Sequence, residues 1–231
     1  MKRIVFLTGA GISAESGIPT FRDAAGMWEN YSIEDVCTAD AWRDHPQRIL
    51  DFYNMLRRKY ADATPNDAHR LVADLERDHD VHVITQNVDG LHEAAGSTHV
   101  LHLHGQIMRA RSDRSETDSY PLDPANPDIH MGDTDPYGCQ LRPHIVFFGE
   151  SVPNLLPATE LVRSAQVFVV VGTSLVVHPA AGLLAYVPTG VPIYYIDPNP
   201  ASIPYGQRVC CIRSGASQGM RELVALLRDG K

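Results

Sequence analysis

The sequence predicts an α/β fold: a doubly wound parallel sheet with helices on both faces, plus a small lobe built from two insertions. Three observations predict it: short apolar runs recur along the chain, helical patterns lie between them, and a glycine-rich turn follows the first run. The chain has 231 residues, of which 44% are hydrophobic and 21% are charged. This length and composition are typical of one globular domain, so they exclude a disordered chain and a disulfide scaffold.

Seven apolar runs have the length of a β-strand and are followed shortly by turn-forming residues. Several of them are apolar on both faces, which is typical of buried parallel strands rather than strands with one solvated face. The runs are 4–7, 81–85, 100–103, 145–148, 167–171, 193–196 and 209–212. We therefore expect these runs to form a parallel sheet.

Two segments between the runs carry an apolar stripe at helical spacing. The stripes are Ala68, Leu71, Val72 and Leu75, and Met220, Leu223, Val224 and Leu227. Residues three or four positions apart share one face of a helix, so each stripe predicts a helix packed against the sheet. Strands that alternate with such helices give the doubly wound arrangement.

Two stretches interrupt this alternation. Residues 31–64 show helical patterns without strands, and residues 106–143 are polar and contain five prolines. The second stretch is too long for an ordinary loop. We expect these two stretches to form the small lobe, beside a sheet domain made of 1–30, 65–105 and 144–231.

Charge and the N-terminal residues limit the partners and the location. The chain has 28 acidic and 20 basic residues, a formal net charge of −8, which argues against a nucleic-acid partner. No apolar run approaches the ~20 residues of a membrane helix, and the run after Arg3 is too short for a signal peptide. We expect a cytoplasmic protein with reduced thiols and no membrane partner. The oligomeric state is not predicted, and a monomer is the default.

A glycine-rich turn lies directly after the first predicted strand. Gly9, Gly11 and Ala14 have the spacing G-x-G-x-x-A, where a strand is expected to pass into a helix. Glycines in this setting let a pyrophosphate approach the backbone, and the helix amides bind it. The alternative is a glycine turn without a ligand. Asp197 and Asn199 follow a late strand, where they are either acceptors for a ribose hydroxyl or simple turn residues.

Longer motifs extend this pattern. They are GAGISAESGIPTFR at 9–22, TQNVDGLH at 85–92, LHG at 103–105, LRP at 141–143, FGE at 148–150 and GTS at 172–174. In this order the set resembles the sirtuins, the NAD-dependent protein-lysine deacylases. The resemblance covers almost the whole chain and is greatest for the short bacterial members.

The resemblance implies a Rossmann-like NAD-binding domain, with NAD and an acyl-lysine peptide or protein meeting in the cleft beside the small lobe. It implies His104 as the general base, Asn87 as a second catalytic residue, and Phe148, Gly149 and Glu150 as a loop that pairs with the peptide as a strand. The residues that it implies for the cofactor are Gly9, Ala10, Gly11, Ala14, Phe21, Arg22, Gln86, Asn87, Asp89, Gly172, Thr173, Ser174, Asp197, Asn199 and Ala216.

The implied reaction consumes NAD and needs no metal. The acyl-lysine carbonyl oxygen is a weak nucleophile that must be held against the anomeric carbon of the ribose while nicotinamide leaves. A base then activates a ribose hydroxyl, and histidine suits this because its reference pKa of ~6.5 lies near working pH. Free lysine and O-acyl-ADP-ribose result. Outside the resemblance, Asn87 and Asp89 are ordinary turn formers, and His102 with His104 is an alternative metal pair without further ligands.

The small lobe departs from the family pattern. Most sirtuins hold a structural zinc ion there with two C-x-x-C pairs. The corresponding positions in this chain are Ser112 and Ser115, and the vicinity of Thr134 and Tyr137. Hydroxyl groups do not replace thiolates as zinc ligands, so we expect no zinc. A remnant site at His130 and Cys139 is the alternative.

The acyl preference is open at the level of sequence. Desuccinylase-like bacterial sirtuins carry Tyr-x-x-Arg on a helix, and this pair binds an acidic acyl chain. This chain has Tyr53, but Leu56 stands three residues on and Arg57 one further. Both positions share a helix face with Tyr53, so acidic and apolar acyl groups remain two hypotheses.

Two functions other than deacylation use the same NAD site. One is an ADP-ribosyltransferase, which His104 argues against because such branches tend to lose this histidine. The other is a non-catalytic sensor of NAD or ADP-ribose, suggested by the missing zinc cysteines.

Overall fold

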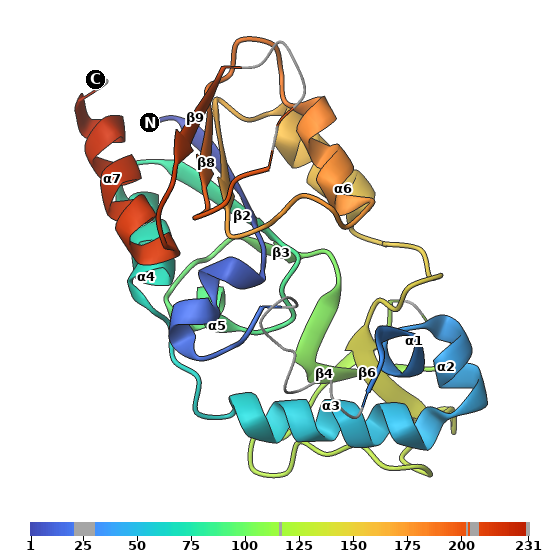
Figure 1. Ribbon diagram of the computed structural model, residues 1–231. Helices are drawn as coiled ribbons and strands as arrows, with labels where there is room; N and C mark the ends of the chain where they lie inside the picture. The colour runs from blue at the N-terminus through green and yellow to red at the C-terminus, as the bar shows by residue number, and fades with distance from the viewer. Residues whose placement is uncertain (21–30, 116, 202, 204–207, 230–231) are drawn as a thin grey trace.

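The computed structural model describes residues 1–20, 31–115, 117–201, 203 and 208–229 (Figure 1). Its centre is a six-stranded parallel sheet with the strand order β3-β2-β1-β7-β8-β9. The strands are β1 (Arg3–Thr8), β2 (Asp80–Thr85), β3 (Val100–His102), β7 (Val167–Val171), β8 (Ile193–Ile196) and β9 (Val209–Ile212). The predicted α/β fold is confirmed, because this order runs outward in both directions from the neighbouring strands β1 and β7.

Helices cover both faces of this sheet. On one face α4 (Asp67–Asp74) and α7 (Ala216–Asp229) pack side by side, and on the other lie α6 (Leu155–Arg163) and the 3₁₀ segment η5 (Ala180–Tyr186) (Figure 1). The short 3₁₀ turn η4 (Leu75–Arg77) follows α4. The two predicted helical stripes face the core between α4, α7 and the sheet. Every side chain of β7 is buried, as expected for a strand covered on both faces.

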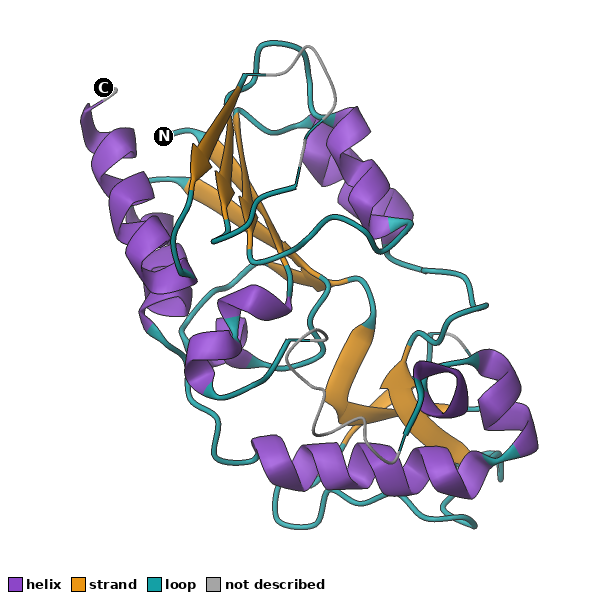
Figure 2. Ribbon diagram, viewed as in Figure 1, coloured by secondary structure: helices purple, strands orange, loops and turns teal. Residues whose placement is uncertain are grey.

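A second, three-stranded antiparallel sheet lies apart from the first (Figure 2). Its strands are β4 (Gly105–Ser112), β5 (Ser119–Pro121) and β6 (Leu141–Ile145). Three helices accompany it: α1 (Ile33–Val36), α2 (Ala39–Asp44) and α3 (Pro46–Tyr60). The short helix α5 (Leu91–Ala94) belongs instead to the loop after β2.

The expectation that 145–148 forms a strand of the parallel sheet was wrong. Ile145 ends β6, which pairs with β4 in the antiparallel sheet, and Phe148 forms only an isolated bridge with Thr38. Ile145 and Phe147 are buried, but in the cluster around α3. An apolar run shows that a segment is buried, and it does not show which sheet the segment joins.

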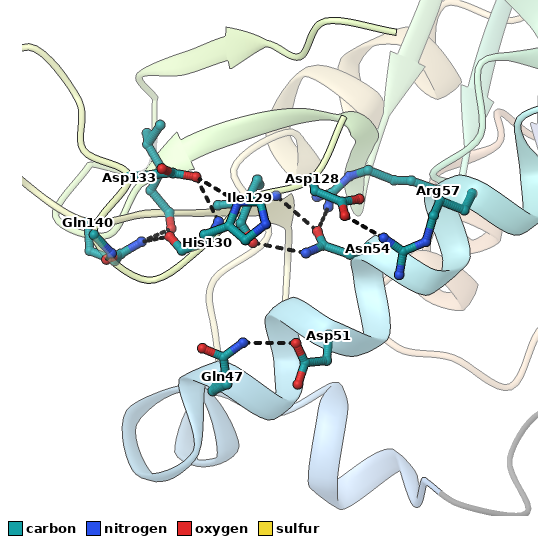
Figure 3. Close-up of polar contacts among 12 residues, drawn as sticks. Gln47, Asp51, Asn54, Arg57, Asp128, Ile129, His130, Asp133 and Gln140 are labelled. Atoms are coloured by element: carbon teal, nitrogen blue, oxygen red, sulfur yellow. Dashed lines mark hydrogen bonds and ion pairs between the residues drawn. The ribbon is translucent and has the colours of Figure 1, made fainter. Parts of the chain in front are cut away.

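Polar side chains tie α3 to the loops of the second sheet (Figure 3). The amide of Asn54 accepts a hydrogen bond from the Ile129 N–H and donates one to the Ile129 carbonyl. Gln140 closes the same loop region by donating to the His130 carbonyl and accepting from the Gly132 N–H. These contacts tie α3 to the loop between β5 and β6 and cross-link that loop within itself. None of the described helices is long and apolar enough to cross a membrane.

Candidate active site

The loops after β1 and β7 cross in direct backbone contact. The Gly11 N–H donates to the Gly172 carbonyl at 2.8 Å, and the Gly9 N–H donates to the Val171 carbonyl at 3.0 Å. A Cβ atom on Gly11 would lie 2.6 Å from the Gly172 Cα, and Gly172 itself has φ +61°. Glycine is therefore required here for the crossing itself, at the point where the strand order reverses and α/β sheets bind ligands.

The glycine turn does not open an α-helix, contrary to expectation. Two 3₁₀ turns follow instead, η1 (Ala10–Ile12) and η2 (Ala14–Ser16). Gly17 then adopts the left-handed conformation with φ +83°, which is typical of the residue that ends a helix, and Pro19 stands two residues further on. Ala10 and Ala14 begin the two turns. Phe21 and Arg22 lie outside the described residues.

The hydroxyl of Ser13 connects two predicted site residues. It donates to Asp89 Oδ2 at 2.9 Å and accepts from Asn87 Nδ2 at 3.1 Å. Next to them, Gln86 Nε2 donates to the Thr173 hydroxyl at 2.9 Å. Burial raises the pKa of Asp89 against the effect of its two hydrogen bonds. The structure thus brings the loops after β1, β2 and β7 together through side chains as well as backbone.

His104 lies beside this cluster with a defined tautomer. Its Nδ1 is 3.0 Å from the Gln86 carbonyl. A carbonyl only accepts, so Nδ1 carries the proton and Nε2 of the neutral ring is an acceptor. Burial lowers the pKa of His104, although the Gln86 contact opposes this. A neutral, oriented imidazole of this kind is suited to remove a proton.

The far end of the sheet holds the residues predicted for the adenosine side. Asp197 Oδ1 accepts from the Asn199 N–H at 2.8 Å, so this aspartate forms the turn that the sequence offered as an alternative. Ala216 is the buried first residue of α7. The adjacent Ser217 N–H donates to Glu15 Oε1 at 3.1 Å, which ties the helix N-terminus to η2. Ser174 follows Thr173 in the loop after β7.

Phe148, in the segment predicted to pair with a peptide, is hydrogen-bonded to the backbone of residues 37 and 39. The Phe148 N–H donates to the Cys37 carbonyl at 2.8 Å, and the Phe148 carbonyl accepts from the Ala39 N–H at 3.0 Å. Phe148 as a whole is 50% exposed. Gly149 has φ +91°. The Glu150 carboxylate does not face solvent but turns inward and joins a buried ion cluster.

Comparison with known proteins places this geometry in a family. Residues 9–179 match the model of the Sir2 family. The chain belongs to the Sir2 family. An NAD-dependent protein deacylase of Bacteroides thetaiotaomicron is 47% identical over 230 residues and covers 98% of each chain. One from Helicobacter pylori is 46% identical over 227 residues, again covering 98% of each chain.

Solved structures give the same assignment. A Sir2 homologue in complex with NAD superposes with a TM-score of 0.88 at 39% identity, covering 99% of this chain and 90% of that one. A Sir2 homologue in complex with ADP-ribose, an S24A mutant, gives the same TM-score and identity and covers 93% of that chain. The resemblance to the sirtuins that the motifs indicated is confirmed.

In this Sir2-family chain the Glu150 carboxylate binds two buried arginines. Oε1 accepts from Arg142 Nη1 at 2.6 Å and from Arg111 Nη2 at 2.9 Å, and Oε2 accepts from the Phe147 N–H at 2.8 Å. The Arg142 guanidinium also stacks on the Phe147 ring at 4.0 Å from its centroid. The cluster fixes the turn that carries Phe148.

The residues considered for acyl recognition point into the protein. The Tyr53 hydroxyl lies 3.7 Å from Cys37 Sγ. Arg57 is 2% exposed, and it donates through Nε to the Ile107 carbonyl at 2.7 Å and through Nη1 to Asn54 at 2.6 Å (Figure 3). Leu56 packs, partly buried, against the apolar cluster around α3.

The residues at the zinc positions of other sirtuins do not fit a zinc ion. Ser112 is buried in β4, and its hydroxyl accepts from the Arg114 N–H. Asp135 accepts from the N–H groups of Tyr137 and Cys139. Among the residues that the structure describes, no group of three or more His, Cys, Asp or Glu side chains is arranged to hold a metal ion.

Sequence reasoning missed several buried polar residues of the site. Ser13 stood inside the first motif without an assigned role, and His69 and His92 were not singled out. His69 Nε2 is 3.5 Å from the Ser13 hydroxyl, and His92 Nε2 is 3.1 Å from the Thr8 hydroxyl. Burial lowers the pKa of His69 to about 4 and that of His92 to about 3. The available signal was a histidine next to apolar residues of a helix, Ala68 beside His69 and Leu91 beside His92.

Proposed function

We propose that this chain is an NAD-dependent protein-lysine deacylase, which consumes NAD to give nicotinamide, O-acyl-ADP-ribose and free lysine. The relatives at 46–47% identity carry the name NAD-dependent protein deacylase over nearly their full length. The observation that carries the proposal is His104, whose Nδ1 is fixed by the Gln86 carbonyl so that Nε2 is available as a base. The net charge of −8 supports protein rather than nucleic-acid substrates.

The residues predicted for the cofactor and for catalysis keep their roles in this proposal. The turn from Gly9 to Ala14 and the residues Gly172–Ser174 bind the phosphates and the adenosine side, with Asp197, Asn199 and Ala216 at the adenosine end. Gln86, Asn87 and Asp89 orient the ribose that bears nicotinamide, together with Phe21 and Arg22. His104 takes the proton from a ribose hydroxyl. NAD supplies the ribosyl group, and the chain orients the acyl oxygen against it and excludes water.

The direct test is peptide-dependent release of nicotinamide. Purified protein is incubated with NAD and acetyl-, succinyl- or long-acyl-lysine peptides, and the products are read by mass spectrometry. O-acyl-ADP-ribose formed only with peptide, and lost in His104→Ala, supports the deacylase. Nicotinamide release without peptide indicates an ADP-ribosyltransferase, and NAD binding without any release indicates a sensor.

We propose further that the enzyme prefers acyl groups without a charge. An acidic acyl chain needs a desolvated arginine presented to it. Leu56 is apolar, and two of the three guanidinium nitrogens of Arg57 already donate to the protein. Burial also lowers the pKa of Arg57 to about 10, which reflects a charge held in an apolar setting.

A substitution at position 56 tests this preference. The wild-type protein should turn over acetyl-lysine peptide faster than succinyl-lysine peptide. Leu56→Arg should raise kcat/KM for the succinyl peptide by about tenfold, the effect of one new charge-assisted contact. Leu56→Met is the matched control and should change kcat/KM for neither the acetyl nor the succinyl peptide. Rapid desuccinylation by the wild type would instead assign the acidic acyl group to Arg57.

We propose also that the lobe formed by 31–64 and 106–143 needs no zinc. Support comes from the serine and aspartate contacts at the zinc positions and from the cross-links made by Asn54 and Gln140. Elemental analysis of the purified protein should find no stoichiometric zinc, and a chelator should leave the melting temperature unchanged. One zinc ion per chain would contradict the proposal.

A further inference from the structure

The last residue of β3, His102, lies between two hydrogen-bond acceptors. Its side chain is 7% exposed. Nδ1 is 2.9 Å from the Asn87 carbonyl, and Nε2 is 2.7 Å from Oε1 of Glu93 on α5. A carbonyl and an ionised carboxylate can only accept. Both ring nitrogens therefore carry protons, and the ring is a buried imidazolium.

The charges around His102 are consistent with this state. Burial opposes its charge, but the hydrogen bond and the charge of Glu93 outweigh burial, so the pKa of His102 is raised. Burial likewise opposes ionisation of Glu93, and His102 outweighs it, so the pKa of Glu93 is lowered. The other titratable groups that face His102 are Asp89, which favours the imidazolium, and His92 and His144, whose pKa values fall to about 3 and about 4. His92 and His144 are thus neutral near pH 7, so neither places a second positive charge beside His102.

His102 and His104 bind successive carbonyls of the loop after β2. His104 donates to the Gln86 carbonyl at 3.0 Å, and His102 donates to the Asn87 carbonyl at 2.9 Å. The two peptide groups that flank Asn87 are therefore each held by a histidine, the first by His104 and the second by His102. The side chain of Asn87 is fixed separately by Ser13. Without His102, the Asn87 carbonyl would lose the partner that sets the direction of this loop.

We propose that His102, locked as an imidazolium by Glu93, is a positioning residue that orients Asn87 in the cofactor pocket. This inference rests on the role proposed above for Asn87. His102 touches neither substrate nor base in this arrangement, and it acts through the backbone of the residue that does. Glu93 acts on Asn87 only through His102, because its carboxylate keeps both ring nitrogens of His102 protonated.

Four variants test the proposal with acetyl-lysine peptide and saturating NAD. His102→Phe keeps a ring and removes both hydrogen bonds, and it should lower kcat by tenfold or more with the peptide KM within about twofold. Glu93→Ala removes the partner of Nε2 and with it one of the two contacts that orient the ring, and it should also lower kcat. Glu93→Gln should retain kcat within about twofold, because its amide donates to Nε2 while Nδ1–H stays on the Asn87 carbonyl. His82→Gln, which alters a histidine–aspartate pair elsewhere on β2, is the control and should match wild type.

Nitrogen-15 NMR of the histidine rings supplies a readout that does not depend on activity. At pH 7 the wild-type His102 ring should show two protonated nitrogens, and in Glu93→Gln it should show the Nδ1–H tautomer alone. A neutral ring in the wild type would overturn the proposal. Equal kcat in Glu93→Ala and Glu93→Gln would overturn it too, even if His102→Phe fails to fold.

A fifth variant separates this inference from the proposed function. If Asn87→Ala is inactive while His102→Phe keeps the wild-type kcat, the positioning role is wrong and the deacylase assignment stands. If Asn87→Ala keeps full activity, the role assigned to Asn87 is wrong and the inference falls with it. Loss of kcat in both, with Glu93→Gln unaffected, is the expected result.

Discussion

Single glycines set the distance between the loops after β1 and β7, which we propose bind the cofactor. A Cβ atom added to Gly11 would lie 2.6 Å from the Gly172 Cα, far inside contact distance, and the atom it meets is backbone. Gly11→Ala should therefore destabilise the fold by about 1–3 kcal/mol, the usual cost of overpacking, and should weaken NAD binding. Denaturant unfolding and calorimetry measure the two effects. Gly90→Ala is the control, because a Cβ there meets no described atom within 4 Å and φ is −105°.

The pH dependence of the rate reports on His104. Its pKa is lowered by burial from the ordinary 6.5, so the neutral base persists into mildly acidic solution. On the acidic side, kcat for acetyl-lysine peptide should fall as pH drops through a value below 6.5. The pH profile from about 4.5 to about 8 checks this. An acidic limb centred above 6.5 would contradict the assignment of His104 as a buried, neutral base.

At the scale of elements, Asn66 joins helix α4 to the loop after β1. Its side-chain oxygen caps the helix by accepting from the Ala68 N–H at 2.9 Å, and its Nδ2 donates to the Ile12 carbonyl at 2.8 Å. Asn66→Ala loses both contacts and should cost about 1–2 kcal/mol of stability. Asn66→Asp keeps the cap and loses only the donor, because aspartate caps as well as asparagine.

The two variants separate the effect of Asn66 on the stability of α4 from its effect on the loop after β1. Unfolding free energies should be lowered clearly in Asn66→Ala and less in Asn66→Asp. NAD affinity should fall in both, since the Ile12 carbonyl loses its partner in each. Unchanged NAD binding in Asn66→Asp would show that α4 does not position the loop.

The Glu150 cluster links the strands of the second sheet to the turn that we propose binds the peptide. Glu150→Gln leaves Arg111 and Arg142 buried with one compensating charge fewer, and breaking such a group typically costs about 3–5 kcal/mol. Because Phe148 is carried on this turn, the KM for peptide should rise more than the KM for NAD. Steady-state kinetics with each substrate varied in turn checks this. The exposed Glu160 of α6 offers the control Glu160→Gln, which should be neutral.

How far the sequence predicted these elements depended on whether the signal was local. The stripe at 68–75 and the glycine spacing at 9–14 are local patterns, and they led to α4 and to the tight turn after β1. The run at 145–148 was correctly predicted as buried and assigned to the wrong sheet, because pairing with β4 is a long-range choice. The 3₁₀ turns after Gly9 were missed, since Gly17 and Pro19 outweigh the helical pattern.

At the scale of the whole molecule, the motifs led to the family and to the loops that form the site, but not to the network beneath them. His69, His92 and His102 owe their importance to partners 9 to 84 positions away in the sequence. No spacing rule links such pairs, so only the fold reveals them. Arg57 is the reverse case: its sequence position suggested a ligand, and its contacts with Ile107 and Asn54 give it a structural role.

Buried histidines make the free energy of unfolding of the whole chain depend on pH. Burial lowers the folded-state pKa of His69 and His144 to about 4 and that of His92 to about 3, against an ordinary value of 6.5. Between pH 6.5 and about 4 the unfolded chain therefore binds protons that the folded chain does not, and the free energy of unfolding falls as pH falls. The contribution of His102 to the free energy of unfolding has the opposite sign, because its pKa is raised in the folded chain. That contribution is fully present below pH 6.5 and is lost as pH rises through the folded-state pKa.

Burial also lowers the pKa of His104, so four histidines with a lowered pKa against one with a raised pKa give a net loss of stability in acid. Each fully titrating group changes the slope by about 1.4 kcal/mol per pH unit, so urea unfolding at half-unit steps from about pH 7 to about pH 4 resolves the effect. His144→Gln should flatten the slope by one group. A free energy of unfolding that stays constant from about pH 6.5 to about pH 4.5 would mean that these histidines are protonated in the folded chain, and the neutral network beneath the cofactor loops would then be wrong.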